Sequence, residues 1–567
     1  MQINDSLVSQ VNDWLDQDPD EKTKAELNEL FAAAKAGNAN AQIELYDAFR
    51  TSLEFGTAGL RGALGPGPNR MNRVTVLKAT AGICEYLNEN GYAGQKVLIG
   101  FDARHNSDVF ARDTAQILAG YGFTPVIFDH VVPTPVLAFA IRNLEACAGI
   151  MVTASHNPPQ DNGYKVYLGD GRQIVSPADV EILNQINKIV DVRDLKYSTV
   201  FDIAPQQIEV AYLKSIEKLI NAGPVSENDR KNTKVVYTAM HGVGWNTLKS
   251  AFKVCKFNEP IAVIEQRDPD PNFPTVLFPN PEEKGALDLA IAKAQTENAD
   301  LLLANDPDAD RLAVALPTAN GDWKMLRGDQ IGILLGWWVS ERARLTGREI
   351  SGTIASSIVS SMMLAVVAKG AGLNYEHTLT GFKWVSRVPN LIYGYEEALG
   401  YCVDPTSVGD KDGISAAAMF TELTCALKLR GQTAWQLLDE LATKYGLFAS
   451  DQISVRVNDI TAVPEIMAQL RSNPPKKFGE LIVSQVVDLS EPESNLPPTD
   501  GIIYYLTGSG HITNGRVIIR PSGTEPKIKC YLEVVSTVED LDVASKLTQE
   551  ALVAVARDAK PLLTGGN

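Results

Sequence analysis

Apolar residues near the start of the chain recur with the period of a helix. Leu27, Leu30, Phe31 and Ala34 are spaced three and four residues apart, and acidic residues surround them. This spacing places the four side chains on one face of a helix. We therefore predict that residues 1–50 are helical and form an N-terminal arm.

Beyond this arm, short apolar runs alternate with longer periodic segments. Runs with the length of buried strands lie at 96–101, 124–128, 148–152, 234–237, 301–304 and around Ile354. Strands that alternate with helices predict βαβ units and a mainly parallel sheet. Three stretches of the chain share this pattern without a strict sequence repeat, so domain duplication is a hypothesis.

The pattern changes from about Ser450 onward. Residues 451–456, 515–519 and 529–534 alternate between apolar and polar side chains, which is typical of strands with one buried face. Helical segments follow these strands, so we predict a C-terminal domain of α+β type. The proline-rich stretches 473–476 and 491–498 are expected to be surface loops.

Length and composition restrict the class of protein. A chain of 567 residues with 45% hydrophobic residues is long and apolar enough for three or four globular domains. The apolar run 331–339 is too short to cross a membrane and is expected to be a buried helix. The N-terminus has no basic and apolar signal pattern, so we expect a cytoplasmic protein without a membrane partner. The six cysteines are scattered, which predicts buried thiols rather than a disulfide framework.

The formal net charge is −17. This charge argues against nucleic acid as a partner, because nucleic-acid binding needs a basic surface. An anionic substrate is compatible with it only where metal, Arg and Lys concentrate positive charge in one site. Several motifs are placed to do this.

The first candidate reactive group is Ser155, in Thr153-Ala-Ser-His-Asn-Pro158 directly after the run 148–152. α/β sheets place reactive groups at the carboxyl ends of their strands. His156 is a polar neighbour, and Lys165 can return to the same site. The alternative is a polar turn in which Ser, Asn and Pro serve only backbone geometry, and the motif alone leaves both open.

Three alternating aspartates indicate a metal site. Asp306, Asp308 and Asp310 lie in Asn305-Asp-Pro-Asp-Ala-Asp-Arg311, directly after an apolar run. On an extended loop this spacing points the three carboxylates to one side, where they need a hard cation, Mg²⁺ or Ca²⁺. An EF-hand fails because Arg311 occupies its glycine position. Three protein ligands leave room for a phosphate oxygen, which suits Mg²⁺, and a solvated acidic turn is the alternative.

A candidate phosphate-binding loop is Arg520-Pro-Ser-Gly-Thr-Glu-Pro526, at the end of a predicted strand. Arg520 offers a guanidinium group and Gly523 exposes backbone N–H groups, while Ser522 and Thr524 offer hydroxyls. The spacing is not that of a Walker loop. An ordinary turn at a strand end is the alternative.

Further loops combine glycine with charged side chains. Glu396 and Glu397, in Tyr393-Gly-Tyr-Glu-Glu-Ala-Leu-Gly400, suit recognition of sugar hydroxyls, although this signal is weak by itself. Weak signals of the same kind, with a plain turn as the alternative, are the segments around Arg61, Lys383 and Lys411.

In this combination and order the motifs resemble the α-D-phosphohexomutase family, which includes phosphoglucomutases and phosphomannomutases. The match consists of T-A-S-H-N-P at 153–158, D-P-D-A-D-R at 306–311, the Glu-Glu loop at 395–400 and R-P-S-G-T-E-P at 520–526. The four motifs follow the order of the family and are spread over residues 153–526, so the resemblance covers nearly all of the chain.

The resemblance implies four domains around a central cleft. Three are expected to be similar α/β domains with mixed sheets, and the fourth a C-terminal α+β domain. The expected bounds are 1–207 for the arm plus domain I, 208–322 for domain II, 323–447 for domain III and 448–567 for domain IV. In that order the domains are expected to carry the phosphoserine loop, the metal loop, the sugar-binding loop and the phosphate-binding loop.

The resemblance also implies roles for single residues. Ser155 is expected to be the phosphoserine, and its phosphate is expected to hold one Mg²⁺ together with Asp306, Asp308 and Asp310. The expected catalytic residues are Ser155, His156, Lys165, Arg61 and Lys383, with Lys165 the first choice as general acid or base. The expected substrate-binding residues are Arg311, Glu396, Glu397, Arg520, Ser522, Gly523 and Thr524.

The implied reaction interconverts a sugar 1-phosphate and 6-phosphate, with glucose as the first choice. Phospho-Ser155 gives its phosphoryl group to a free sugar hydroxyl, and the resulting bisphosphate returns its other phosphate to Ser155. Glucose 1,6-bisphosphate is then the intermediate and activator. Such transfers depend on positioning and charge neutralisation, which Mg²⁺, Arg and Lys supply.

One position departs from many glucose and mannose members, which carry Glu-Glu-Ser or Glu-x-Ser in the sugar loop. Ala398 lacks that hydroxyl, and one lost hydrogen bond costs about 0.5–1.5 kcal/mol. Together with Ala-Met-His-Gly-Val-Gly at 239–244, this loop resembles the branch that holds phosphopentomutase-like and glucose-1,6-bisphosphate-synthase-like members. Phosphopentomutase and phosphomannomutase activities are therefore alternatives.

Functions of other classes are disfavoured. A hydrolytic phosphatase needs an open, wet site, whereas a cleft between domains closes against water. A non-catalytic phosphosugar-binding protein is expected to lose Ser155 or one of the three aspartates, and all four are present. The sequence leaves the oligomeric state open.

Overall fold

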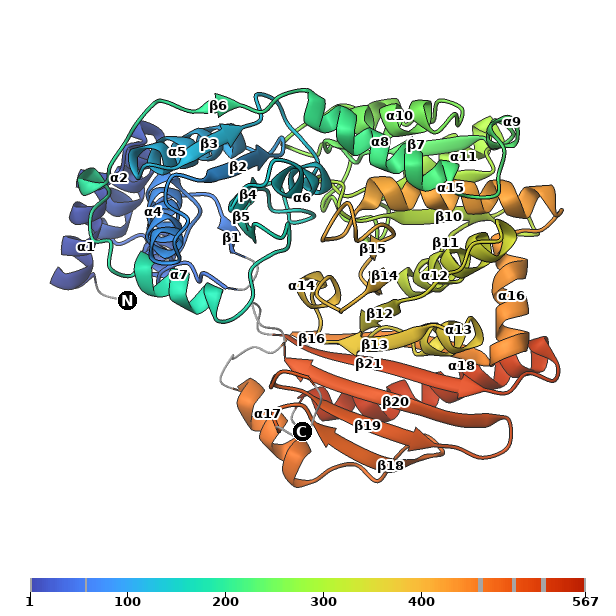
Figure 1. Ribbon diagram of the computed structural model, residues 1–567. Coiled ribbons are helices and arrows are strands. Elements are labelled where there is room, and N and C mark those ends of the chain that lie inside the picture. Colours follow the sequence, from blue (N-terminus) through green and yellow to red (C-terminus); the bar gives the residue numbers. More distant parts are fainter. Residues whose placement is uncertain (1–2, 57–58, 457–461, 492–495, 522–526, 565–567) are drawn as a thin grey trace. The chain divides into compact units, whose positions relative to one another are not determined.

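The computed structural model describes residues 3–56, 59–456, 462–491, 496–521 and 527–564. Contacts divide the chain into two units: residues 1–326 with 400–426 form the first, and residues 327–399 with 427–567 form the second (Figure 1). Within the described ranges, no helix combines the length and the apolar character needed to span a membrane. All six cysteines are buried thiols, as predicted.

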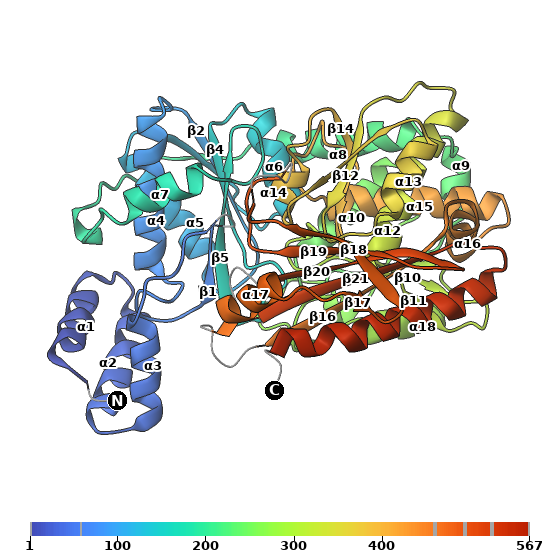
Figure 2. The same ribbon diagram turned by 90° about the horizontal axis from the view of Figure 1, so that it is seen from below.

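The N-terminal arm is helical, as predicted. Helices α1 (Asp5–Gln17), α2 (Glu21–Lys35) and α3 (Ala39–Phe49) pack against one another within the first unit (Figure 2). Leu27 and Phe31, from the apolar stripe seen in the sequence, are buried in the same core as the first α/β domain. Each helix begins after a side chain that accepts a hydrogen bond from its first turn, namely Asn4, Asp20 and Asn38.

The first α/β domain has a mixed sheet in the order β1-β5-β4-β2-β3-β6. β2 is parallel to β3 and β4, whereas β5 is antiparallel to β4 and β1. The strands are β1 (Leu60–Ala63), β2 (Lys96–Phe101), β3 (Thr124–Ile127), β4 (Ala148–Val152), β5 (Asp161–Leu168) and β6 (Asp202–Ile203). The helices are α4 (Arg73–Glu89), α5 (Ser107–Gly120), α6 (Thr134–Asn143) and α7 (Ala178–Ile186), with a short 3₁₀ turn η1 (Val192–Asp194).

The second α/β domain repeats this topology. Its sheet order is β11-β10-β9-β7-β8, so β10-β9-β7-β8 matches β5-β4-β2-β3 in order and in strand direction. This agreement supports the duplication hypothesis. The strands are β7 (Val235–Thr238), β8 (Ile261–Ala262), β9 (Leu301–Ala304), β10 (Ala313–Pro317) and β11 (Trp323–Met325). The helices are α8 (Gln207–Asn221), α9 (Glu227–Arg230), α10 (Gly244–Val254), η2 (Ile264–Gln266) and α11 (Asp288–Glu297).

A later segment, residues 400–426, also belongs to the first unit. It contains β15 (Gly400–Cys402) and most of α15 (Gly413–Leu429). A β-bridge joins Gly400 to Arg311, directly beyond the aspartate loop. The segment thus brings residues distant in sequence to the carboxyl ends of β4 and β9.

The second unit begins with parallel strands in the order β13-β12-β14, the order of β3-β2-β4 in the first domain. These strands are β12 (Thr353–Ser357), β13 (Asn374–Thr378) and β14 (Leu391–Glu396). The helices are α12 (Gly328–Leu345), α13 (Met363–Gly370), α14 (Phe382–Val385) and α16 (Ala434–Tyr445). The apolar run 331–339 lies inside α12 and most of its side chains are buried, as predicted.

The C-terminal domain is of α+β type, as predicted. Its antiparallel sheet has the order β16-β21-β20-β19-β18-β17, and α17 and α18 contribute to one core on its face (Figure 1). The strands are β16 (Leu447–Arg456), β17 (Lys477–Phe478), β18 (Leu481–Asp488), β19 (Ile502–Thr507), β20 (Ile512–Pro521) and β21 (Lys527–Ser536). The helices are α17 (Ala462–Ser472), α18 (Leu541–Ala559) and the short η3 (Lys560–Thr564).

Candidate active site

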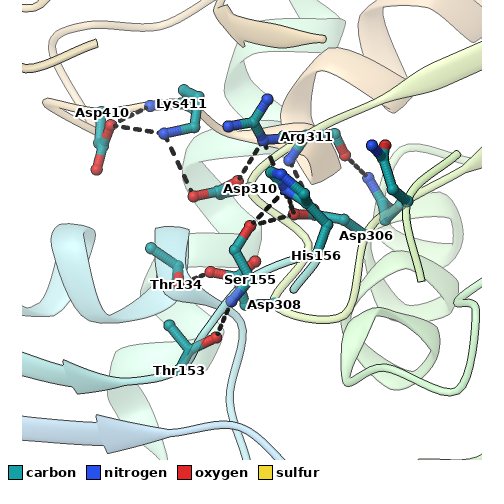
Figure 3. Close-up of polar contacts among 12 residues, drawn as sticks. Thr134, Thr153, Ser155, His156, Asp306, Asp308, Asp310, Arg311, Asp410 and Lys411 are labelled. Atoms are coloured by element: carbon teal, nitrogen blue, oxygen red, sulfur yellow. Dashed lines mark hydrogen bonds and ion pairs between the residues drawn. The ribbon is translucent and has the colours of Figure 1, made fainter. Parts of the chain in front are cut away.

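Ser155 lies just beyond the carboxyl end of β4 and is almost fully buried. Its backbone is left-handed, with φ of +51°, which is unusual for a residue with a side chain. Its N–H donates to Oγ1 of Thr153 at 2.9 Å, and its hydroxyl donates to Oδ2 of Asp306 at 2.7 Å (Figure 3). The same hydroxyl lies 3.2 Å from Nδ1 of His156. The serine oxygen is therefore aimed at the aspartate loop.

The aspartate loop follows β9 and is buried. Ligand oxygens of Asp306, Asp308 and Asp310 all lie within 4.8 Å of one another, as the alternating sequence predicts. Between them, Ala309 has φ of +56°, and the loop is closed by a hydrogen bond from the Asn305 side chain to the carbonyl of Arg311. Three carboxylates thus converge at the place to which the Ser155 hydroxyl points (Figure 3).

Among the described residues, Asp308 and Asp310 each have one carboxylate oxygen that accepts hydrogen bonds from the protein and one that accepts none. Oδ2 of Asp308 accepts hydrogen bonds from Thr134 Oγ1 and Lys165 Nζ, both at 2.6 Å. Oδ2 of Asp310 accepts from Lys165 Nζ at 2.8 Å. Their Oδ1 atoms are buried and accept no hydrogen bond from any residue that the structure describes. Buried acceptors without donors are rare, and two on adjacent carboxylates suit a cation.

The charges around Asp308 and Asp310 also suit a bound cation. Burial and the charge of Asp310 raise the pKa of Asp308 above its ordinary value. Although burial opposes its charge, Lys165, Lys411 and Arg311 hold the pKa of Asp310 far below the usual range. Burial and the neighbouring negative charge therefore oppose the ionisation of Asp308, and a divalent cation bound here would favour its charged form.

Lys165 comes from β5, the strand beside β4, and its ammonium group is buried between Asp308 and Asp310. Burial disfavours its charge, but the two carboxylates outweigh burial and raise the pKa of Lys165. The side chain is therefore protonated at neutral pH. It can donate a proton or stabilise negative charge.

Other predicted site residues of the first unit surround this cluster. Burial and the nearby guanidinium groups of Arg311 and Arg61 lower the pKa of His156 well below its usual value, so its ring is neutral. Nε of Arg311 lies 3.8 Å from Asp310 Oδ1 and 4.0 Å from Asp306 Oδ2. Arg61, on β1, donates to Oδ1 of Asn157 at 3.2 Å, in the loop that carries Ser155.

Lys411 is part of the cluster, although its loop was only a weak signal in the sequence. Its ammonium lies 3.3 Å from Oδ2 of Asp310 (Figure 3). The neighbouring aspartates are held by buried tyrosines: Asp410 accepts from Tyr167, and Asp412 from Tyr212. The Asp-Lys-Asp-Gly loop was visible in the sequence, but its partner lies a hundred positions away and no local pattern connects them.

The close approach of the Lys411 loop to the aspartate loop explains why residue 413 is a glycine. A Cβ added at Gly413 would lie 2.3 Å from the carbonyl oxygen of Arg311, so only glycine permits this close approach of the two loops. Thr134 was missed for a similar reason, because its bond to Asp308 spans 174 positions of the chain.

The remaining predicted residues belong to the second unit. Glu396 ends β14 and is buried, whereas the Glu397 carboxylate accepts hydrogen bonds from the hydroxyls of Ser357 at 2.9 Å and Ser360 at 3.2 Å. Lys383 lies in α14. Arg520, near the end of β20, donates to the hydroxyl of Thr380. Ser522, Gly523 and Thr524 lie outside the described residues.

Four family models match the chain. Their descriptions are phosphoglucomutase/phosphomannomutase alpha/beta/alpha domain I (residues 52–193), domain II (210–320), domain III (327–445) and C-terminal domain (511–550). The chain therefore belongs to the phosphoglucomutase/phosphomannomutase family, and its four domains are three α/β domains and a C-terminal α+β domain. It is a phosphosugar mutase, an intramolecular phosphotransferase of the isomerase class.

Similar proteins carry several names. A probable phosphomannomutase from Haemophilus influenzae is 46% identical over 469 residues, which cover 82% of this chain and 93% of that protein. The human phosphopentomutase is 38% identical, covering 93% of this chain and 91% of that protein. Among solved structures, a putative phosphomannomutase from Thermus thermophilus shares the fold with a TM-score of 0.68 at 22% identity, covering 90% of this chain and 99% of that one.

Proposed function

We propose that this mutase interconverts α-D-glucose 1-phosphate and glucose 6-phosphate through a phosphorylated Ser155. The observation that carries the proposal is the 2.7 Å contact between the Ser155 hydroxyl and Asp306, which sets a nucleophile against three convergent carboxylates. Phospho-Ser155 donates its phosphoryl group to a free sugar hydroxyl and later takes the other phosphate back from the bisphosphate. Glucose 1,6-bisphosphate is then both intermediate and activator.

The donor set fits one Mg²⁺ per chain. Asp306, Asp308 and Asp310 offer carboxylate oxygens, which hard cations prefer, and no described histidine or cysteine joins their cluster. The unmatched Oδ1 atoms of Asp308 and Asp310 are suitable ligands. The Ser155 phosphate is proposed to complete the protein's share of the site. Bound there, Mg²⁺ supplies positive charge against the phosphoryl oxygens during transfer.

The chain's own cations and hydrogen-bonding groups complete the machinery. Lys165 is our first choice as general acid or base, because its buried ammonium can protonate a leaving oxygen or stabilise its charge. His156 is neutral and can accept a hydrogen bond from the Ser155 hydroxyl once the phosphoryl group has left. Arg61 and Arg311 are proposed to neutralise phosphate charge, with Lys383 in support of Lys165.

Recognition of the sugar is proposed for the loop with Glu396 and Glu397, whose carboxylates can accept hydrogen bonds from sugar hydroxyls. The support is the motif itself and the position of Glu396 at the end of β14. The phosphate that does not react is proposed to bind at Arg520, Ser522, Gly523 and Thr524.

The test is a coupled assay of the purified chain with Mg²⁺ and a trace of glucose 1,6-bisphosphate. Glucose 1-phosphate should be converted to glucose 6-phosphate, and omission of the bisphosphate should slow the start of the reaction. Parallel reactions with mannose, ribose and deoxyribose 1-phosphates rank the sugars. Absence of hexose 6-phosphate formation would remove the glucose assignment.

A pentose phosphate is the second candidate substrate. It is favoured by Ala398, which lacks the serine hydroxyl of many glucose and mannose members, and by the similarity to the human phosphopentomutase. The same panel of sugars decides between the two.

A further inference from the structure

We infer that Arg104 is a positioning residue that fixes the Ser155 loop for phosphoryl transfer. This inference rests on the proposed role of Ser155. Arg104 lies just after β2, and its side chain is completely buried. A charged side chain so fully buried needs partners, and nearly all those of Arg104 lie in one loop.

The guanidinium group donates to four backbone carbonyls, three in the loop after β4 and one at the first residue of β5. Nη2 bonds to the carbonyl oxygens of Ser155 at 2.7 Å and Asn157 at 2.5 Å. Nη1 bonds to those of Pro158 at 2.8 Å and Asp161 at 3.1 Å. Backbone carbonyls in an irregular loop lack the partners that a helix or sheet provides, and the planar fork of one arginine supplies them here.

Arg104 is itself held in place. Oδ1 of Asp102 accepts from the backbone N–H of Arg104 at 3.0 Å and from the Ser107 hydroxyl at 2.7 Å, while Oδ2 lies 3.5 Å from Nε of Arg104. The ring of Phe273 lies 4.9 Å from the guanidinium carbon. The guanidinium thus has a fixed orientation and a buried counter-charge.

This arrangement fixes the conformation of Ser155 from both sides. Its N–H is held by Thr153 and its carbonyl by Arg104, which together maintain the left-handed φ of +51°. Such a conformation persists only where the surroundings determine it. Since the backbone dihedrals set the direction of the Cα–Cβ bond, they also set the aim of Oγ at Asp306. Phosphoryl transfer depends mainly on such positioning.

The chain provides a matched control in Arg230. It is also buried, and its guanidinium donates to the carbonyls of Cys255 at 3.0 Å and Ile220 at 3.1 Å and to the Asn221 side chain at 2.7 Å. It lies in α9 and contacts no residue of the Ser155 loop or the aspartate loop in any of these bonds. Loss of a buried arginine can therefore be separated from loss of this particular one.

The experiment compares Arg104→Lys with Arg230→Lys in the full chain, with kcat, KM and thermal midpoint measured for each. Lysine keeps the charge but cannot span four carbonyls. Both variants should lose thermal stability. Arg104→Lys should lower kcat by about 100-fold, the effect expected of a misplacement of about 1 Å, with KM almost unchanged. Arg230→Lys should keep its kcat. Equal kcat losses in the two variants, or a near-normal kcat in Arg104→Lys, would overturn the positioning role.

Chemical rescue gives a second readout. Guanidinium at concentrations too low to denature should raise kcat of Arg104→Ala and leave Arg230→Ala unchanged, and no gain in Arg104→Ala counts against the inference. Ser155→Ala, measured alongside, reports on the proposed function itself. Full activity of Ser155→Ala would refute the proposed function. If Ser155→Ala is inactive and Arg104→Lys is fully active, only the positioning role of Arg104 is refuted.

Discussion

The hydroxyl of Thr134 donates a 2.6 Å hydrogen bond to Oδ2 of Asp308, and the backbone N–H of Thr134 donates to the Asp308 carbonyl at 2.9 Å. Thr134 opens α6 in the first α/β domain, whereas Asp308 lies in the loop after β9 in the second. The contact therefore joins two domains of the first unit and orients one carboxylate. With Oδ2 held by Thr134 and Lys165, Oδ1 is the oxygen left for a cation.

Thr134→Val should weaken metal binding while the fold is kept. Valine has nearly the shape of threonine but cannot donate, so Asp308 loses one of the bonds that orient it. Partners of this kind typically contribute 10–100-fold to metal affinity, and we expect a loss of about tenfold in Mg²⁺ affinity by calorimetry. Thr134→Ser restores the donor and should restore most of the affinity. Equal affinities of Thr134→Val and wild type would contradict the orienting role.

Ser155 should carry phosphate in the active protein. Intact-mass and peptide analysis after incubation with glucose 1,6-bisphosphate should find one added phosphoryl group on Ser155. Ser155→Ala should lose nearly all mutase activity, since no other hydroxyl is placed at Asp306 in the described contacts. Thr153→Ala is a useful comparison, because it removes a neighbouring hydroxyl that holds the Ser155 N–H and should reduce activity only in part. Mutase turnover by Ser155→Ala at the wild-type rate would refute the proposed phosphoserine mechanism.

Removal of the divalent cation should abolish activity reversibly. Excess chelator should stop turnover, and added Mg²⁺ should restore it. Asp308→Asn keeps the shape of the side chain but lowers the negative charge, so it should weaken metal binding strongly. Its thermal midpoint without metal should change little, because loss of the charge relieves repulsion from Asp310 while it weakens the buried ion pair with Lys165. Activity that persists undiminished in excess chelator refutes a metal requirement.

The positions of the Ser155 loop and the aspartate loop could be predicted from the sequence, because strands buried on both faces are continuous apolar runs. β2, β4 and β9 have the predicted bounds, and Ser155 and Asp306 follow β4 and β9 directly. β5 was not predicted, since Asn162 and Lys165 interrupt its apolar pattern. Both are buried, and their polar groups are satisfied by partners elsewhere in the chain.

The contacts that join these loops had no local signal. Thr134, Arg104 and Lys411 act on residues of other loops, and their partners are fixed by the tertiary arrangement rather than by spacing. Arg104 resembled any polar residue after a strand. Only its burial and its four carbonyl partners set it apart.

Glu397 should make stability depend on pH. Burial, with the charges of Glu396 and Asp329, raises the pKa of Glu397 from 4.5 to about 7. The folded state therefore binds the proton more tightly than the unfolded state. The contribution of this tighter proton binding to the free energy of unfolding is complete below about pH 4.5 and is lost as the pH rises through about 7. Glu397→Gln mimics the protonated form. The thermal midpoint of this variant should therefore rise relative to that of wild type as the pH increases from about 4.5 to about 7. A difference between the two midpoints that does not change with pH would speak against the raised pKa.

The loop that contains Ala398 should discriminate only weakly among sugars. In the proposed sugar pocket, Glu396 and Glu397 can accept hydrogen bonds from sugar hydroxyls, whereas the methyl group of Ala398 can form none. One fewer side chain is then available to recognise the sugar than in a Glu-Glu-Ser pocket. A missing neutral hydrogen bond costs little, which predicts loose discrimination among sugars. Glucose 1-phosphate should be the best substrate, and at least one other sugar phosphate should be turned over measurably.

Ala398→Ser restores the hydroxyl and should change the ratio of kcat/KM between glucose and ribose 1-phosphates by about 2–10-fold, the effect of one hydrogen bond of about 0.5–1.5 kcal/mol. Its thermal midpoint should hardly change, and Ala398→Gly is the control for a substitution that adds no donor. If the wild-type enzyme instead prefers a pentose phosphate by more than about 100-fold, a gap of roughly 2.7 kcal/mol in transition-state binding, the glucose assignment is wrong. In that case the same phosphoserine chemistry operates on a pentose phosphate. The change that Ala398→Ser makes in the ratio of kcat/KM for glucose and ribose 1-phosphates then measures how much of the preference for pentose is due to the missing serine hydroxyl.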